Sequence, residues 1–237
     1  MNRILLMVMR NITKVPGLYA KLCHYAKNTD KYSRQESWDH IRKILKIGVN
    51  SGNVDLKVFG VENIPEEDGM LFYGNHQGLF DAVALVSACH KPLSAVLKQE
   101  IKNIPFIKQV VACTASYPMD RNDDRQSLKI MQNIAKDVAS GSNFVIFPEG
   151  TRSREGNKMI EFHGGSFRPA IKAKCPVVPM VFIDTYKVFD SKSSDMVSCQ
   201  LHFLPPVQPE EYEGMKAGEL AELVKARIQE TLDKYAE

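Results

Sequence analysis

Short apolar runs rich in β-branched residues alternate with stretches of helical periodicity over most of this 237-residue chain. The apolar runs predict β-strands at 55–61, 70–74, 93–97, 109–117, 143–147, 176–184 and 197–204. Helices are expected at 80–89, 123–140 and 166–174, and an exposed, charge-rich helix at 217–235. Strands that alternate with helices predict an α/β fold: a single domain with a mixed, largely parallel sheet and helices on both faces.

The first 50 residues follow a different pattern, that of an amphipathic helical hairpin. At about 100° per residue, one sector about 100° wide collects the apolar side chains Ile4, Leu5, Val8, Ile12, Val15, Tyr19 and Leu22. The opposite side is basic and holds Arg3, Arg10, Lys14 and Lys21. Pro16-Gly17 predicts a break into two short helices. A further helix is expected near 37–47, with one apolar side made by Trp38, Ile41 and Leu45.

Two interpretations of this hairpin are open, and both can hold together. The helices can pack on the α/β body, or they can lie in a membrane interface with their basic side toward lipid head groups. Residues 1–50 hold ten Lys or Arg and three acids, a net +7, which leaves −4 for the remainder of a chain whose total is +3. Such a basic end favours an anionic surface as partner. We therefore predict a membrane-association segment at 1–50 and an α/β domain at 51–237, attached peripherally to the cytoplasmic face of a membrane.

Composition narrows the class of protein further. A hydrophobic content of 44% and a charged content of 25% are typical of a globular domain, and no run of about 18 apolar residues predicts a spanning helix. The five cysteines are scattered among apolar residues, which predicts buried free thiols in a reducing compartment. No Cys or His spacing predicts a metal site. The basic residues lie on an amphipathic helix and not beside aromatic stacking residues, so we expect no nucleic-acid partner.

A histidine and an aspartate five positions apart, His76 and Asp81, form the first candidate site. His76 follows the apolar run 70–74 in a turn bracketed by glycines, and Asp81 falls near the start of the next helix. In that layout the carboxylate can accept a hydrogen bond from one ring nitrogen and leave the other free as a base. Imidazole suits this role because it titrates near neutrality. Taken alone, a pair of this spacing is also compatible with a structural role.

A second candidate site follows the apolar run 143–147. Open α/β sheets bind ligands beyond the carboxyl ends of their strands, which is where residues 149–153 would lie. Gly150 lets the backbone approach a ligand, and Thr151 offers a hydroxyl. Arg152 offers a fork that matches phosphate oxygens. The segment is therefore typical of an anion site.

Two further cations stand at predicted strand ends, Lys98 and Arg121. With Arg152 they would place three cations at three strand ends, as a clamp for phosphate. The alternative is that the arginines at 152 and 154 form surface ion pairs, which we favour for Arg154 but not for Arg152. The acids available for such pairs are Glu149 and Glu155.

Together the two blocks resemble motifs of the glycerolipid acyltransferase family, the lysophosphatidate (1-acyl-sn-glycerol-3-phosphate) acyltransferases and their relatives. The block from Asn75 through His76 to Asp81 resembles the family's first motif, and residues 147–153 match its third in full. Three further matches are Arg121 with the second motif, Val177-Val178-Pro179-Met180 with the fourth, and Phe162 with Gly165 in a Phe-x-x-Gly pattern. The resemblance covers about residues 54–185.

Three positions depart from the family pattern. Gly78 replaces the serine usual between the histidine and the aspartate, and His163 stands where a lysine is common. Residues 114–120 replace the Gly-x-Ile-Phe-Ile pattern usual before Arg121. The last two departures bear on the head group of the acceptor more than on the chemistry.

The resemblance implies transfer of an acyl group from acyl-CoA or acyl-carrier protein to the free hydroxyl of 1-acyl-sn-glycerol-3-phosphate, giving phosphatidate. His76, oriented by Asp81, would deprotonate that hydroxyl. The implied phosphate-binding residues are Lys98, Arg121, Glu149, Gly150, Thr151 and Arg152, of which Glu149 and Gly150 would shape the loop. The implied partners are a lysophospholipid and an acyl thioester at a membrane surface, and the chemistry requires no metal, cofactor or covalent intermediate.

Other functions stay open. Glycerol-3-phosphate or another lysolipid would fit the same motifs as acceptor. A hydrolase would need Ser166 as nucleophile, but the Gly-x-Ser-x-Gly elbow is absent. A non-catalytic phospholipid-binding protein would use the basic end and the clamp without the histidine.

Overall fold

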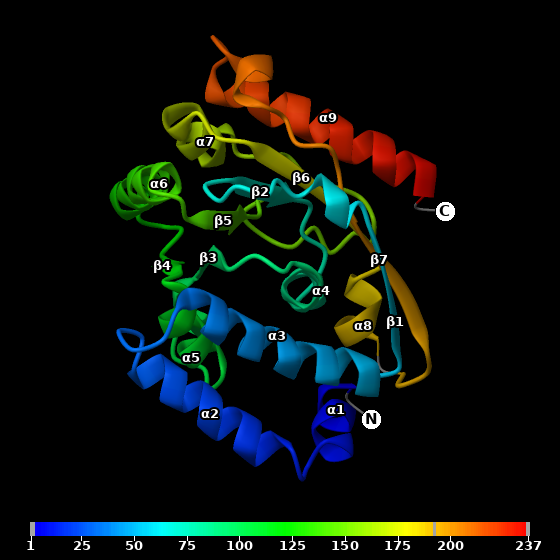
Figure 1. Ribbon diagram of the computed structural model, residues 1–237. Helices are drawn as coiled ribbons and strands as arrows, with labels where there is room; N and C mark the ends of the chain where they lie inside the picture. The colour runs from blue at the N-terminus through cyan, green and yellow to red at the C-terminus, as the bar shows by residue number, and fades with distance from the viewer. Residues whose placement is uncertain (1–2, 192, 236–237) are drawn as a thin grey trace.

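The computed structural model describes residues 3–191 and 193–235, so the predicted limits at residues 1 and 237 lie outside the described residues. Within this part of the chain, seven strands form one sheet in the order β1-β7-β6-β2-β5-β3-β4 (Figure 1). The strands are β1 Val54–Phe59, β2 Leu71–Gly74, β3 Leu93–Lys98, β4 Tyr117–Met119, β5 Asn143–Ile146, β6 Val177–Ile183 and β7 Val197–Phe203. The helices are α1 Arg3–Arg10, α2 Val15–Lys27, α3 Arg34–Ser51, α4 Phe80–Ala88, α5 Ile107–Thr114, α6 Asp124–Ala139, α7 Arg168–Ala173, α8 Tyr186–Asp190 and α9 Ala217–Tyr235.

Most of the sheet is parallel, which brings several strand ends to one edge. Strands β6, β2, β5, β3 and β4 run parallel to one another. β7 pairs antiparallel with β6, and β1 pairs parallel with β7, so these two run the other way. Tyr73 of β2 stands beside Ile146 of β5 and Pro179 of β6, so the carboxyl ends of β2 and β5 are level, and β6 extends past them to Ile183. The predicted α/β class with a mixed, largely parallel sheet is confirmed.

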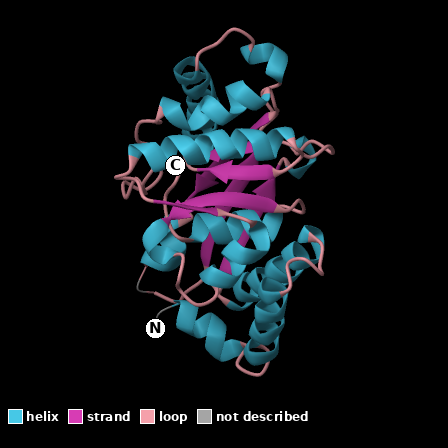
Figure 2. Cartoon of the chain, turned by 90° about the vertical axis from the view of Figure 1, so that its left-hand side faces the viewer, coloured by secondary structure: helices cyan, strands magenta, loops and turns pink. Residues whose placement is uncertain are grey.

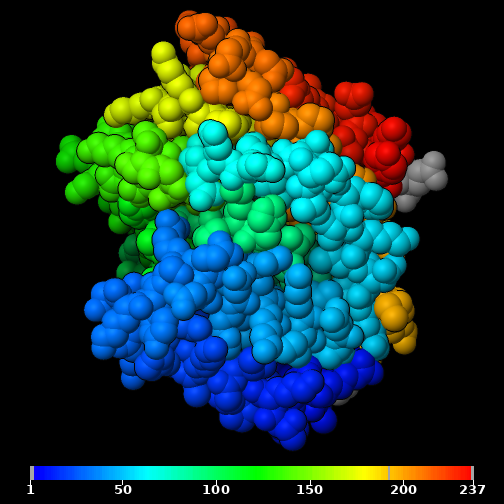
Figure 3. Space-filling view, in the orientation of Figure 1, coloured from blue at the N-terminus to red at the C-terminus, as the bar shows by residue number. Residues whose placement is uncertain are grey.

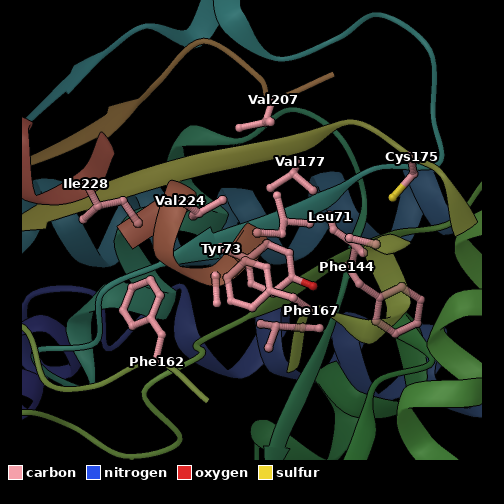
Figure 4. Packing of buried hydrophobic residues seen from close by; sticks show 14 of the residues in the cluster. Leu71, Tyr73, Phe144, Phe162, Phe167, Cys175, Val177, Val207, Val224 and Ile228 are labelled. Atoms are coloured by element: carbon pink, nitrogen blue, oxygen red, sulfur yellow. The ribbon is translucent and has the colours of Figure 1, made fainter. Parts of the chain in front are cut away.

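Helices cover both faces of the sheet, as predicted (Figures 1 and 2). Side chains alternate along β2: Leu71 and Tyr73 enter a core closed by α6, α7 and α9, whereas Phe72 enters a core closed by α3, α4 and α8. In the first core the rings of Tyr73 and Phe167 stack with centroids 4.0 Å apart (Figure 4). With apolar cores on both sides, the central strands are rigid supports for whatever follows their carboxyl ends.

Two predicted elements are corrected. Of residues 109–117, predicted as a strand, 109–114 lie in the helix α5, and the strand β4 begins only at Tyr117. The segment 217–235 is helical as predicted, but it is not exposed throughout. One side of α9 is buried against the sheet and carries Leu220, Ala221, Val224, Ile228 and Leu232.

The N-terminal helices α2 and α3 pack on the body as a hairpin. Pro16 lies in the first turn of α2, where the missing N–H leaves no hydrogen bond unmade, so α1 and α2 separate near the predicted break. Trp38 of α3 is buried, and its Nε1 donates to the carbonyl of Cys89 (3.1 Å). These helices form one end of the molecule, drawn in blue in Figure 3. The packed-hairpin interpretation therefore holds for α2 and α3.

Arg3 contradicts the helical-wheel prediction, because it is only 2% exposed. Its Nε donates to the carbonyl of Val188 (2.8 Å), and its Nη1 donates to that of Gly52 (2.7 Å). Its remaining N–H groups reach the carbonyls of Asn53, Ser193 and Asp195. The guanidinium thus satisfies backbone acceptors from three separate segments, and it fixes α1 to the end of α3 and to α8.

The apolar side of α1 and of the turn that follows it, which includes Ile12, remains at the surface. The exposed fractions are 51% for Leu5, 42% for Val8, 54% for Met9 and 65% for Ile12. No helix in residues 3–191 and 193–235 has the length and apolar character needed to span a membrane. The five cysteines are free, and four of them are buried as predicted, whereas Cys23 is only half-buried.

Candidate functional site

The turn after β2 is pinned to the neighbouring strand β6 by Asn75. This side chain is buried; its Nδ2 donates to the carbonyl of Phe182 (2.9 Å), and its Oδ1 accepts from the N–H of the same residue (2.8 Å). These two hydrogen bonds fix the path of the backbone where it leaves β2. His76 follows at the carboxyl edge, and its side chain is 19% exposed.

His76 and Asp81 meet as the sequence predicted. Nδ1 of His76 lies 2.7 Å from Oδ2 of Asp81, a residue buried in the first turn of α4. The same oxygen accepts from the N–H groups of Gln77 (2.7 Å) and Gly78 (3.0 Å). Because a carboxylate with these donors can only accept, Nδ1 carries the proton and Nε2 keeps its lone pair. Such a ring can act as a base.

The other oxygen of Asp81 is held by Thr185, which sequence reasoning missed. The fully buried Thr185 places Oγ1 2.5 Å from Oδ1 of Asp81 and 3.0 Å from Oε1 of Gln77. Gln77 in turn donates from Nε2 to Oδ1 of Asn157 (2.8 Å). Thr185 stands just past the end of β6, beside β2, and that position was the only signal available. The hydrogen bond from Thr185 leaves the carboxylate of Asp81 little freedom to rotate.

The loop after β5 closes over His76 from the other side. The ring of Phe147 stacks on the imidazole with centroids 4.3 Å apart. Oε1 of Glu149 accepts from the N–H of His76 (2.9 Å), and the N–H of Ser153 donates to the carbonyl of His76 (2.9 Å). Glu149 is buried, and its Oε2 accepts from the N–H of Ile160. Although we grouped Glu149 with the phosphate-binding residues, its carboxylate turns inward and shapes the loop.

The charge state of Glu149 is set mainly by its burial. Burial, with a smaller contribution from the negative charge of Asp81, raises the pKa of this carboxyl to about 7 against the opposing effect of the N–H groups of His76 and Ile160. Gly150, the next residue, has φ +67°, and a Cβ there would lie 3.1 Å from Cδ2 of His163. The buried carboxyl of Glu149 and the positive φ of Gly150 thus both shape the loop that follows β5.

Arg152 and Arg154 line a cavity of about 380 Å³, together with Gly156, Tyr186 and Asp190. Neither guanidinium forms an ion pair within the described part of the chain, so the expected surface pair of Arg154 with an acid is not formed. Glu149 is unavailable because it is buried beside His76. Thr151, between Gly150 and Arg152, is exposed.

Lys98 and Arg121 belong to a different group of charges. Nζ of Lys98 pairs with Oε1 of Glu100 (2.9 Å), and Arg121 also contributes to the lowered pKa of Glu100. Neither cation is among the residues that line the cavity of Arg152. β3 and β4 come after β5 in the strand order, whereas the cavity includes residues of α8, which follows β6. Of the three cations predicted to form a phosphate clamp, Arg152 alone is among the residues that line this cavity, and the complete clamp stays a prediction.

Ser166 is not placed as a nucleophile. Its Oγ donates to the carbonyl of His163 (2.7 Å), and its own carbonyl accepts from the hydroxyl of Tyr73 (2.8 Å). The hydroxyl is thus engaged with the backbone and not with a histidine base. A hydrolase built on Ser166 is not supported.

A family model described as Acyltransferase matches residues 55–183. The 1-acyl-sn-glycerol-3-phosphate acyltransferase of Saccharomyces cerevisiae is 28% identical over 197 residues, which are 81% of this chain and 63% of that protein. The protein of the same description from Borreliella burgdorferi is 27% identical and covers 63% of this chain and 59% of its own length. The chain thus spans less than two thirds of these relatives.

One solved structure covers the whole fold. The crystal structure of the 1-acyl-sn-glycerophosphate acyltransferase PlsC from Thermotoga maritima matches with a TM-score of 0.76 over 98% of this chain and 97% of that one. The sequence identity is 20%, so this likeness bears on the fold alone.

Proposed function

This chain belongs to the acyltransferase family, and on that premise we propose that it acylates the free hydroxyl of 1-acyl-sn-glycerol-3-phosphate to give phosphatidate. The single observation that carries the proposal is the orientation of His76, whose Nδ1 is bonded to buried Asp81 beside a loop that bears Arg152. The choice of acceptor is supported by the relatives from Saccharomyces cerevisiae and Borreliella burgdorferi, which are described as 1-acyl-sn-glycerol-3-phosphate acyltransferases.

The proposed reaction needs only the acceptor and an acyl thioester, either acyl-CoA or acyl-carrier protein. Nε2 of His76 takes the proton of the acceptor hydroxyl as its oxygen attacks the thioester carbonyl. The C–S bond then breaks, a C–O ester bond remains, and the imidazolium returns the proton to the leaving thiolate. Asp81 stabilises the imidazolium in between. Arg152 holds the phosphate of the acceptor through its planar fork, and no metal or further cofactor takes part.

A panel of acceptors tests this function. Purified protein is incubated with acyl-CoA, and separately with acyl-carrier protein, in the presence of lysophosphatidate, glycerol-3-phosphate, lysophosphatidylcholine or lysophosphatidylethanolamine. We expect phosphatidate as the main product by mass spectrometry. Faster acylation of another acceptor would replace the proposed substrate, and no product from any of them would leave a non-catalytic lipid-binding role.

We further propose that α1 attaches the protein to the cytoplasmic face of a membrane. The exposed side chains of Leu5, Val8, Met9 and Ile12 support this, together with the anionic lipids of that leaflet and the basic character of residues 1–50. The double variant Val8→Glu/Ile12→Glu should bind anionic vesicles at least about tenfold more weakly in sedimentation, because burying two such side chains contributes several kcal/mol.

The matched control for this experiment is Leu128→Glu, at an apolar residue of α6 that is 44% exposed. It introduces the same kind of change away from α1 and should leave vesicle binding as in the wild type. Equal binding by the wild type and the double variant would remove α1 from the membrane contact.

A further inference from the structure

The cavity lined by Arg152 and Arg154 is also bounded by Tyr186, a residue outside the motifs. Tyr186 begins α8 and packs between the two loops of the site. A Cβ on Gly78, in the turn after His76, would lie 3.0 Å from Cα of Tyr186. A Cβ on Gly156 would lie 3.4 Å from the Tyr186 hydroxyl. The tyrosine therefore joins the turn of the base to the loop of Arg152.

The approach of Tyr186 bears on a departure in the sequence. Gly78 stands where the family resemblance leads one to expect serine, and a side chain there would be in tight contact with the first turn of α8, which would have to give by a few tenths of an ångström. The contact is with the backbone and Cβ of residue 186, so glycine at 78 lets the start of α8 lie close to the turn after His76.

The charges of the cavity point to an anion with more than one charge. Arg152 and Arg154 both line it, and neither has an acidic partner among the residues that the structure describes. The neighbouring cation Lys187 differs, since its Nζ is paired with Asp184 (2.9 Å). The lining contributes one carboxylate, Asp190, against two guanidiniums. Two forks and a tyrosine hydroxyl can donate to several phosphate oxygens at once.

We propose that Arg154 and Tyr186 bind the phosphate monoester of the acceptor together with Arg152, and that Asp190 weakens this binding by repulsion. A phosphate monoester carries close to two negative charges at neutral pH, whereas the diester of a larger head group carries one. Two guanidiniums therefore favour the monoester. This inference rests on the proposed function and adds the residues that select the head group.

A zwitterionic head group is the competing occupant, because Asp190 would attract its ammonium. The placement of Lys187 argues against it. Nζ of Lys187 lies 5.8 Å from the centre of the Tyr186 ring, so an ammonium that reached this ring would meet a cation already there. The two occupants give opposite outcomes when Asp190 is neutralised.

Steady-state kinetics of the full chain test the proposal. Arg154→Ala should raise the KM for lysophosphatidate about tenfold, which corresponds to the loss of one charge-assisted hydrogen-bonding group. Arg154→Lys should fall between, since it keeps the charge but loses the fork. Tyr186→Phe should raise this KM severalfold, and Asp190→Asn should lower it severalfold. The KM for acyl-CoA should stay unchanged throughout.

Arg227→Ala is the matched control. Arg227 lies on α9 and pairs with Glu211, outside the cavity, so its KM for lysophosphatidate should equal that of the wild type. Thermal melting of each variant separates loss of binding from loss of fold. An unchanged KM in folded Arg154→Ala overturns the proposal, and so does a shift confined to the KM for acyl-CoA. If the wild type acylates lysophosphatidate but the variants at Arg154, Tyr186 and Asp190 have the same KM as the wild type, this inference is overturned and the proposed function stands.

The behaviour of Asp190→Asn decides between the two occupants. A raised KM for lysophosphatidate, with loss of transfer to lysophosphatidylethanolamine, would assign the cavity to a zwitterion and overturn the proposal. Wild-type protein that acylates no acceptor at all would overturn the proposed function and this inference with it.

Discussion

Replacing His76 by alanine is expected to reduce kcat for acyl transfer by at least about a thousandfold, because the reaction loses its base. The fold should survive, since Asp81 keeps the N–H groups of Gln77 and Gly78 and the hydroxyl of Thr185. Initial rates at saturating acyl-CoA and lysophosphatidate measure kcat, and circular dichroism shows whether the fold is retained. Turnover like that of the wild type would exclude His76 as the base.

A graded series around the same dyad separates catalysis from structure. Asp81→Asn should lower kcat by about 10²–10⁴, because an amide cannot hold the ring in the required tautomer as a carboxylate does. Thr185→Val keeps the shape and removes the hydroxyl, so we expect about a tenfold loss in kcat with little change in KM. Thr185→Ser should restore most of the rate. Equal kcat in the valine variant and the wild type would reduce Thr185 to a packing role.

Periodicity located β2 and β5 because each is a short apolar run with turn residues at its end. It failed at 109–117, since a short apolar run is compatible with either a strand or a helix. Tertiary contacts decided that case. Val110 and Cys113 of α5 pack against Leu22 and Ile41 from the N-terminal hairpin, and a helix presents both residues to that hairpin at once. Such partners, far away in the sequence, cannot be read from the run itself.

In the candidate site too, residues close together in the sequence could be predicted, whereas residues brought together from distant parts of the chain could not. His76 and Asp81 were predictable because one turn and the start of one helix place them together. Thr185 and Tyr186 come more than a hundred residues later, and the pairing of β6 with β2 brings them to the dyad. The sequence also predicted cations at several strand ends. It contained no strand order, so it could not show that β3, which ends at Lys98, lies on the side of β5 opposite to β2 and β6.

Arg3→Ala is expected to lower the free energy of unfolding by about 3 kcal/mol, because it leaves carbonyl groups buried without their charged donor. For a chain of this size the melting temperature should fall by about 6–12 °C. The guanidinium bonds to the carbonyls of Gly52 and Val188 and to three others, and burial lowers its pKa against the opposing charge of Asp195. Thermal melting followed by circular dichroism measures the loss.

Arg10→Ala provides the comparison within the same helix. Arg10 is exposed and donates to the carbonyl of Ser51 (2.8 Å) and to Oδ1 of Asn53 (2.6 Å), so water can replace both bonds. We expect it to cost less than about 1 kcal/mol. Arg3→Lys should lie between the two, because one ammonium has three donors on a single atom and cannot reach five carbonyls. Equal melting temperatures for Arg3→Ala and Arg10→Ala would mean that α1 is held by its apolar contacts and not by this guanidinium.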